Sequence, residues 1–548
     1  LLLSFFYVNN GVTMGEDNGA TFLLSNNNWN VFFYVWDERI YNGIPNYYGL
    51  FGFFPHILGL LFGPTISAFI YYFTLLFCGF IGCYLFLCEL FFYESKEEKY
   101  PEVQIAAFFG TLIYFFNPIS VVHRLGVTLS GGAVFYIIFP LVGLLVLRYH
   151  RDRNPFKLLI FTFLVVLIFG KGFGDVFRWA IQLPLFIIFL LIVQNQYKRR
   201  FFDLLKVSPL IFLLLLPFFI IIITGTFKML SFASLMINPI GNLNYMKSVV
   251  YEWQAVFLYP SYLWHGLESY NRYYMKPPVI FSWLVVIIFI YLPIIFKNKF
   301  NQRESYLWKV YLASTLILVL TIPLLALPKW IYGDIFTELF TRYKFLWAFR
   351  TPYDKFNTVC LFFATISFSA SMALLIQRFN HNKRTMLICL VTVTICIAII
   401  SLPALKGDVA YRPQTKFNPT KELLDEWEVL EDYANSGKMI LIPSSYSIWI
   451  YSKFGYHGID YLPWILPGNH LTYGYMFNRL TRILYDDMTS PEFNLTSLKR
   501  AENVLYALGV KYIVLRKDIN LTQQAEKSPD KNKIYTFYTN SKYLIRYL

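Results

Sequence analysis

The sequence predicts a polytopic α-helical membrane protein, and three observations support this fold class. Of the 548 residues, 56% are hydrophobic and only 15% are charged. The mean hydropathy of +0.47 exceeds that of soluble globular proteins. The apolar residues also gather in runs of about 20, the length that a helix needs to cross a bilayer. We therefore expect about 11 transmembrane helices in a multi-pass protein of the cell membrane.

Apolar runs account for ten of these helices, and residues 1–8 look like the outer end of one more. The runs cover 65–91, 104–118, 131–148, 156–171, 175–196, 205–226, 278–297, 307–328, 357–378 and 385–404. Lys and Arg gather in alternate turns, near residues 96–99, 148–153, 198–200, 297–303 and 378–384. The positive-inside rule places these turns in the cytoplasm, so the other connections and everything after Leu405 are expected outside.

A second domain is expected where the hydropathy falls near Leu405. We predict a membrane domain over 1–404 and a C-terminal extracytoplasmic α/β domain over 405–548. In the second domain "KELLDEWEVLEDYANS" has a helical pattern, whereas "KMILIPSS", "KYIVLRKD", "KIYTFYT" and "YLIRYL" look like strands. Asn494 and Asn520 each begin the tripeptide NLT, which is the acceptor pattern for N-glycosylation.

The charge and the cysteines exclude other classes of protein. The formal net charge is +15, but the basic residues lie in short turns between apolar runs, so topology explains them and no nucleic-acid partner is expected. The six cysteines all fall inside apolar runs. This placement indicates neither a disulfide framework nor a metal-binding cluster.

The first outer loop holds acidic residues that the topology rule does not explain. Glu16 and Asp17 come soon after the first helix, and "WDER" follows with Asp37 as a third carboxylate. The apolar stretch "ILGLLFG" is too short to span a bilayer and is expected to lie along the interface or to re-enter the membrane. The loop would then carry its carboxylates over the helix bundle, as candidates for catalysis. Candidate substrate-binding residues of this loop are Trp36, Glu38 and His56.

A second outer stretch, "TRYKFLWAFRTPYDKF" over 341–356, combines cations with aromatic residues. Arg and Lys can bind a polyisoprenyl phosphate while the rings, Trp347 among them, flank a lipid or a sugar. The alternative is an aromatic belt with snorkelling cations at the end of an ordinary helix. The four cations of the stretch are Arg342, Lys344, Arg350 and Lys355.

A third outer turn, "FGKGFGDVFRW", brings three charges to the membrane surface, where charges are costly and usually paired or functional. Lys171 and Arg178 are candidates for binding a phosphate. Equally, Asp175 could pair with either of them and simply neutralise the turn.

Three stretches of the chain together resemble one family. "WDERIYNGIPNYYGLFGFFPHILGLLFG" (36–63), "FRTPYDKF" (349–356) and "ALGVKYIVLRKD" (507–518) are similar to motifs of the arabinofuranosyltransferase-type branch of the GT-C superfamily. These membrane glycosyltransferases and their uncharacterised prokaryotic relatives use sugars linked to a lipid phosphate. The resemblance implies many spans, an acidic first outer loop and an outward C-terminal domain.

The resemblance also implies roles for particular residues. In this family an acid of the first loop is the general base, which corresponds here to Asp17 or Glu16, with Asp37 as the alternative. Arg350 and Lys355 match the basic positions of the late helix and would stabilise the leaving phosphate. The chain reads "GED" where arabinofuranosyl enzymes have a spaced pair of aspartates, so the sugar and the base stay open. A divalent cation as cofactor stays open too.

The expected function is therefore an inverting glycosyltransferase of the outer membrane face. Its donor would be a polyprenyl (dolichyl) phosphate-linked sugar, and its acceptor a glycan, glycoprotein or glycolipid of the cell envelope. The composition, rich in Phe, Tyr, Ile, Asn and Lys, favours an archaeal envelope. The alternatives are a transporter or flippase of a lipid-linked or anionic substrate, which predicts ionisable residues at mid-membrane depth, and a non-catalytic envelope scaffold. Membrane lipids and unknown envelope proteins are the remaining partners.

Overall fold

The computed structural model describes most of the chain, and it divides into two compact units. The residues described are 2–8, 12–13, 36–37, 44–45, 53–92, 101–125, 131–152, 154–174, 176–193, 247, 252–260, 273–295, 305–327, 329, 333–343, 346, 351–379, 382–406, 416–442, 449–454, 457–459, 462, 470–471, 479–526 and 531–548. The first unit contains Leu1–Leu3, Phe73–Phe219 and Phe227–Ala410, and the second contains Ser4–Tyr72, Ile220–Thr226 and Tyr411–Leu548. The domain boundary expected at Leu405 stays a prediction.

Membrane-spanning helices dominate the described residues, which confirms a polytopic membrane protein. Six helical stretches are long and apolar enough to cross a bilayer. They are α4 (Phe53–Phe92), α6 (Gly131–Asp152), α13 (Pro277–Ile295), α14 (Ser305–Thr321) with the 3-10 turn η8 (Ile322–Ala326), α16 (Pro352–Phe379) and α17 (Lys383–Leu405). Three shorter apolar helices are α5 (Pro101–Phe116), α7 (Pro155–Phe169) and α8 (Val176–Val193). The expected number of about 11 stays a prediction, because the run 205–226 lies outside the described residues.

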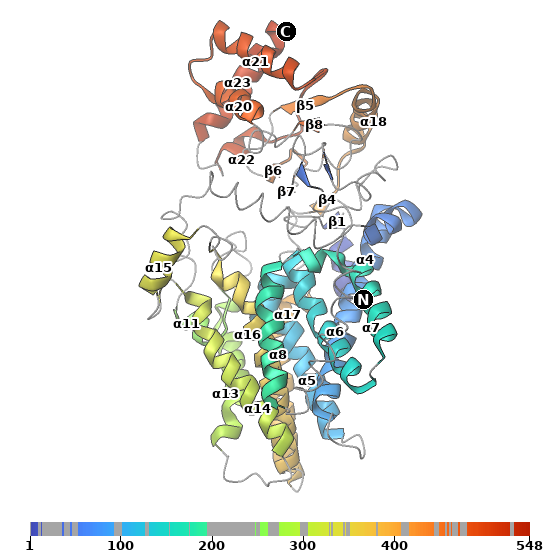
Figure 1. Cartoon of the computed structure of the whole chain (residues 1–548), viewed down its shortest axis with the longest axis vertical. Helices are drawn as coiled ribbons and strands as arrows, with labels where there is room; N and C mark the ends of the chain where they lie inside the picture. The colour runs from blue at the N-terminus through green and yellow to red at the C-terminus, as the bar shows by residue number, and fades with distance from the viewer. Residues whose placement is uncertain are drawn as a thin grey trace. The chain divides into compact units, whose positions relative to one another are not determined.

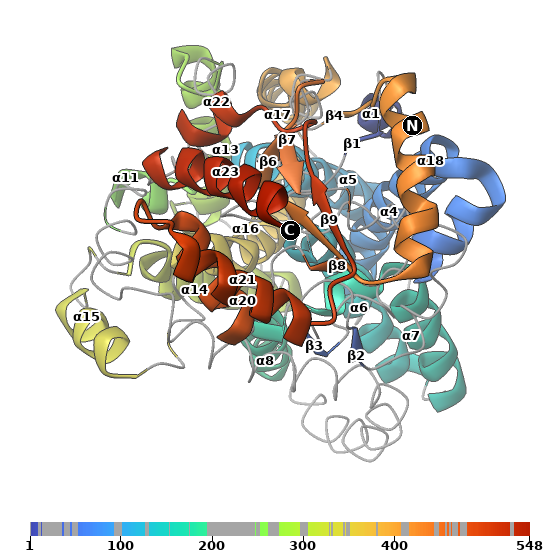
Figure 2. The same ribbon diagram turned by 90° about the horizontal axis from the view of Figure 1, so that it is seen from above.

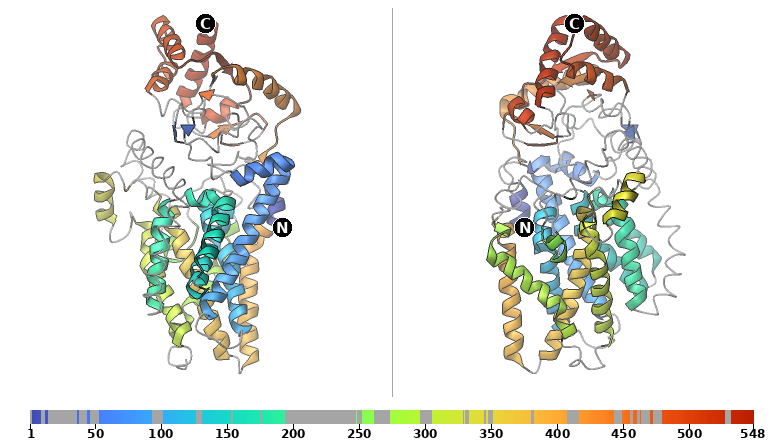
Figure 3. Two further views of the ribbon diagram at one scale, coloured as in Figure 1. Left: turned by 45° about the vertical axis from the view of Figure 1, so that its right-hand side comes forward. Right: turned by 90° about the vertical axis from the view of Figure 1, so that its left-hand side faces the viewer.

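Helix α16 is the centre of the first unit. Every residue of its apolar stretch is buried, and α5, α8, α13 and α14 pack against it. Figures 1 and 3 show these helices running side by side. Small polar residues within α16 allow this packing: the Ser367 hydroxyl bonds that of Ser314 at 2.9 Å, and Ser371 donates to the Phe289 carbonyl.

Helix α4 contains a break about ten residues after its beginning. Gly63 has φ +74°, a left-handed conformation that suits glycine, and Pro64 follows it. The stretch "ILGLLFG" is helical up to Phe62 and ends at this kink, in Gly63.

The C-terminal part of the second unit combines a small sheet with helices. Strands β8 (His470–Leu471), β5 (Met439–Ile442) and β9 (Tyr512–Leu515) are parallel and lie in that order. Helix α18 (Lys421–Ser436) lies on one side of them, as Figure 2 shows. On the other side lie α20 (Arg479–Thr489), α21 (Leu495–Ala507) and α23 (Lys531–Tyr547), which share a core around Met488, Leu505 and Leu544. Thr420 caps α18 by accepting a hydrogen bond from the Leu423 amide.

Short strand pairs complete the second unit. Strand β6 (Trp449–Tyr451) pairs with β7 (His457–Ile459), and α22 (Leu521–Glu526) follows β9. Near the N-terminus β2 (Trp36–Asp37) pairs with β3 (Ile44–Pro45). Strand β1 (Val12–Thr13), which follows α1 (Leu2–Val8), pairs with β4 (Lys416–Phe417).

The last helix corrects one prediction from the sequence. The stretches "KIYTFYT" and "YLIRYL" were expected to be strands but both belong to α23. The buried residues of α23 recur every three or four positions, which is the spacing of a helix face. They are Ile534, Phe537, Asn540, Ser541 and Leu544. The β-branched and aromatic residues of these stretches favour strands by propensity, and packing against α20 overrides that preference.

Candidate functional site

Three helices of the first unit meet where they begin, and an ion pair joins two of them. The Arg178 guanidinium, in the first turn of α8, donates to the Asp354 carboxylate at 2.5 Å and to the Asp354 carbonyl at 3.1 Å. The side chain of Arg178 is 4% exposed and that of Asp354 is 17% exposed. Asp354 lies in the first turn of α16, where a negative charge also favours the helix dipole.

The structure pairs Arg178 with a carboxylate from another helix, that of Asp354. The two roles predicted for Arg178, pairing with Asp175 and binding of a phosphate, stay predictions. Asp175 itself lies outside the described residues.

The third helix, α6, comes close to the pair through a glycine. A Cβ placed on Gly132 would lie 2.0 Å from Nη1 of Arg178 and 2.5 Å from its Cζ. Only a residue without a side chain fits there while Arg178 holds Asp354. The sequence "SGGAVF" therefore provides the space through which the guanidinium reaches α16.

Aromatic rings line the same end of α8. The Trp179 indole donates to the Gly172 carbonyl at 3.0 Å, which ties α8 to the turn η5 (Gly170–Gly174). Phe173 stacks on Trp179 with ring centroids 5.0 Å apart, and Phe135 of α6 meets the indole edge-on at 4.9 Å. These contacts fix the first turn of α8 and hence the position of Arg178.

A chain of tyrosine hydroxyls anchors the beginning of α16 to other helices. Tyr353 donates to the Tyr259 carbonyl at 2.5 Å, and Tyr259 donates to the Tyr274 carbonyl. Tyr274 in turn donates to the carbonyl of Ile400 in α17 at 2.9 Å. Burial raises the pKa of the Tyr259 phenol, so it serves as a neutral donor. The first turn of α16 is therefore held by contacts of Tyr353 and of Asp354 with different parts of the chain.

The segment that Tyr353 binds contains a strained turn. Leu258 follows α11 (Glu252–Val256) and has φ +48°, a conformation that is rare for a bulky residue. The Trp283 indole donates to the Phe257 carbonyl at 2.7 Å, and the Gln254 amide donates to the Pro260 carbonyl at 2.7 Å. Backbone strain of this kind persists only where the surroundings fix it, and it is often found at functional sites. No residue pattern in the sequence predicts this turn.

A buried polar cluster closes α5. The Asn117 amide donates to the Ile113 and Tyr114 carbonyls, and its oxygen accepts from the Ser120 amide at 2.8 Å. Ser120 begins the π-helical turn η4 (Ser120–Leu125), and π-turns are frequent at functional sites. The hydroxyls of Tyr114 and Tyr136 each donate to the backbone carbonyl of the other residue, which locks α5 to α6.

Other predicted site residues are scattered in the described structure. Lys355 is half-buried in the first turn of α16, whereas Arg342 is exposed at the end of α15 (Gly333–Arg342) beside the Tyr343 ring. His56 is buried near the beginning of α4. Trp36 and Asp37 form β2 and Lys171 belongs to η5, but their side chains lie outside the described residues, as do Glu16, Asp17, Glu38, Lys344, Trp347 and Arg350 altogether.

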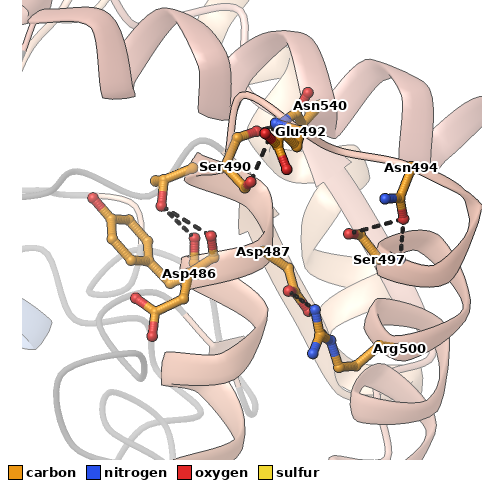
Figure 4. Close-up of polar contacts among 10 residues, drawn as sticks. Asp486, Asp487, Ser490, Glu492, Asn494, Ser497, Arg500 and Asn540 are labelled. Carbon is orange, nitrogen blue, oxygen red and sulfur yellow. Dashed lines mark hydrogen bonds and ion pairs between the residues drawn. The ribbon is translucent and has the colours of Figure 1, made fainter.

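The two candidate glycosylation sites both begin helices of the second unit. The Asn494 side-chain oxygen accepts from the Ser497 amide at 3.1 Å, and Asn520 caps α22 by accepting from the Gln523 amide at 3.2 Å. Figure 4 shows the first cap beside the two-pronged pair of Arg500 with Asp487. Glycosylation of either site stays a prediction. Within the described ranges no group of three or more His, Cys, Asp or Glu residues could hold a metal ion.

No protein-family model matches the chain, and no curated protein sequence matches it. Among solved structures it is similar to the arabinofuranosyltransferase AftD from mycobacteria, with a TM-score of 0.54 and 12% identity over 98% of this chain and 36% of that one. A mutant of the same protein matches with a TM-score of 0.54 and 11% identity over 98% and 37%. The chain thus spans little more than a third of these proteins. The likeness confirms at the level of the fold the resemblance seen in the sequence.

Proposed function

We propose that this protein is a membrane glycosyltransferase of the GT-C type, which transfers a sugar from a polyprenyl (dolichyl) phosphate to an acceptor of the cell envelope. The observation that carries the proposal is the likeness to AftD, which extends over 98% of this chain. Proteins of different activity can share a fold, so the activity must also be argued from the residues where α6, α8 and α16 begin.

The beginning of α16 is the best candidate for the donor phosphate. Lys355 is half-buried in its first turn, and Arg350 precedes that turn by a few residues. The N-terminus of a helix attracts anions through its unpaired amides and its dipole. The Asp354 carboxylate is paired with Arg178. In this proposal Arg178 holds the first turn of α16 in place, and Lys355 and Arg350 neutralise the phosphate. Lys171, Lys344 and Arg342 remain candidates for the same role.

The chemistry follows from the first-loop acids. Asp17 or Glu16, with Asp37 as the alternative, accepts the proton of an acceptor hydroxyl. The hydroxyl oxygen then forms a bond to the anomeric carbon, while the bond from that carbon to the phosphate oxygen breaks and its electron pair leaves with the lipid phosphate. The attack comes from the face opposite the phosphate and inverts the anomeric configuration. Cations at the phosphate stabilise the charge that develops on it.

The charges of the first unit support an enzyme over a transporter. A transporter or flippase is expected to place ionisable groups at mid-membrane depth. Arg178, Asp354 and Lys355 instead lie in the first turns of their helices.

Substitution of the acids tests the proposal in membranes supplied with a sugar donor linked to a lipid phosphate. Asp17→Asn and Glu16→Gln, alone and combined, should abolish sugar transfer in at least one case. A matched control is Asp486→Asn, an exposed acid of α20. Unchanged transfer in both single variants and in the double variant would exclude these residues as the base, and loss in Asp37→Asn alone would assign the base to Asp37.

A second test concerns the phosphate. Arg350→Ala and Lys355→Ala should raise the KM for the donor much more than the KM for the acceptor, because only the donor carries the phosphate. Equal effects on both substrates would contradict the phosphate role.

A further inference from the structure

Among the described residues of the first unit, the buried amide of Gln182 has no hydrogen bond at either of its polar atoms. Gln182 lies in α8 with no exposed surface, and neither its amide nitrogen nor its oxygen has a partner among the described residues. Burying an amide without hydrogen bonds is costly, so such groups in folded proteins normally have partners.

The position of Gln182 follows from the contacts on either side of it. Arg178, one turn earlier, reaches Asp354 of α16, and Phe186, one turn later, meets Phe362 of α16 with ring centroids 5.7 Å apart. Gln182 is one turn from each of these residues, so it lies on the same face of α8, between the two contacts with α16. It lies about 6 Å deeper along the helix than the ion pair.

The facing part of α16 is polar as well. Asn357 and Thr358 lie between Asp354 and Phe362, and both are fully buried. The Thr358 hydroxyl donates to the Lys355 carbonyl at 3.3 Å. A layer of polar residues thus lies between the ion pair and the contact of Phe186 with Phe362. It consists of Gln182 from α8 and of Asn357 and Thr358 from α16.

We propose that Gln182 binds a hydroxyl group between α8 and α16, one turn below the Arg178–Asp354 pair. The amide offers a donor and an acceptor side by side, and a hydroxyl group or a water molecule can satisfy both. A phosphate would satisfy the donor only, and a cation the acceptor only. The hydroxyl comes either from a water molecule held in the resting protein or from the sugar of the donor, and this second source rests on the proposed function.

The test compares melting temperatures of the purified full-length protein in detergent. Gln182→Met keeps the length of the side chain and removes both polar atoms. The matched control is Gln104→Met, in the first turn of α5, where the glutamine is half-buried and has no buried polar atom without a partner. Each variant is measured alone, with farnesyl phosphate, and with farnesyl phosphate bearing a pentofuranose.

We expect Gln182→Met alone to melt a few degrees below the wild type, with the control unchanged or higher, because a bound water loses its site. A cryo-EM map of the wild type should then show a density peak on the amide. If the amide is instead met by another side chain of the protein, the proposal is overturned.

The ligand arms separate the two sources. The hydroxyl is assigned to the sugar if two results are found together. Without ligand, Gln182→Met melts at the wild-type temperature or above it, and of the two lipid shifts it loses only the one caused by the sugar-bearing lipid. Higher melting with both lipid shifts intact overturns the proposal, as does higher melting when neither lipid shifts the wild type. If neither lipid changes the melting temperature of the wild type, the result counts against the proposed function. The comparison of the two proteins without ligand still shows whether Gln182 holds a water molecule.

Discussion

The guanidinium of Arg178 and the carboxylate of Asp354 lie 2.5 Å apart although the two residues are 176 positions apart in the chain. The contact joins the first turn of α8 to the first turn of α16, the central helix of its unit. Because both side chains are largely withdrawn from solvent, the pair determines how these two helix ends are placed.

Removing one partner of this pair should destabilise the protein strongly. We expect Arg178→Met to cost about 3 kcal/mol, because it leaves a largely buried carboxylate without its cation. The double variant Arg178→Met with Asp354→Asn should melt above the single variant, since the uncompensated charge is gone. Melting in detergent measures both. Arg151→Met is the control, because Arg151 pairs with Glu89 at 2.6 Å but is 53% exposed, and such pairs contribute about 0–1 kcal/mol. Equal losses in the two single variants would contradict the prediction.

A methyl group at Gly132 should act through Arg178. We expect Gly132→Ala to cost about 1–3 kcal/mol, because the nearest atoms to the new Cβ all belong to the pinned guanidinium. The same substitution made in the Arg178→Met protein should have little effect. A double-mutant cycle on melting temperatures measures the coupling. Additive losses would show that Gly132 matters for a reason other than the guanidinium.

Tyr512 of the second unit should ionise early. Its hydroxyl bonds the Ser436 hydroxyl at 2.9 Å and Lys511 lies beside its ring, and these neighbours lower the pKa of the phenol below its ordinary value. The titration of Tyr512 is the difference between the phenolate absorbance curves of the wild type and of Tyr512→Phe. Its midpoint should lie below pH 10, the ordinary pKa of a tyrosine. Because the folded-state pKa is the lower one, ionisation adds stability that is present above the unfolded pKa and is lost as the pH falls through the folded one.

The control for this titration is Tyr451, whose pKa burial raises. The component missing from Tyr451→Phe should appear above that of Tyr512. The reverse order would mean that the Ser436 and Lys511 contacts do not form in solution.

The orientation of the C-terminal unit can be tested from outside the cell. Tyr506 lies in the last turn of α21 and is 87% exposed, so Tyr506→Cys places a thiol in water. The natural cysteines all lie in membrane-spanning helices and are buried or half-buried. We expect a membrane-impermeant maleimide to label Tyr506→Cys in intact cells, as the distribution of basic turns predicts. Labelling only after the membrane is opened would reverse the predicted topology.

The sequence was most informative about the membrane helices, because hydropathy depends on local composition. The run expected over 104–118 corresponds to α5, which ends at Phe116 just before the Asn117-Pro118 step. The runs expected over 357–378 and 385–404 correspond to α16 and α17. Hydropathy identifies such segments whatever their neighbours are.

The contacts where α6, α8 and α16 begin could not be predicted in the same way. Asp175, three residues from Arg178, is the carboxylate that the sequence offers as a partner, whereas Asp354 reaches Arg178 only through helix packing. The left-handed Leu258 has no sequence signature, since the hydrogen bonds that hold it come from Trp283 and Tyr353 in distant helices. Gln182 looks like an ordinary interruption of an apolar run until its burial is known.

The pairing of β1 with β4 has a consequence for biosynthesis. Val12 lies opposite Phe417, so the partner strand is made about 400 residues later. At about 5–20 residues per second, roughly 20–80 s pass between the two events. During that interval the ribosome delivers every membrane-spanning helix that separates the strands. Strand β1 therefore stays without its partner strand until these helices have been made. A protein whose synthesis is arrested before residue 416 would never form the pair.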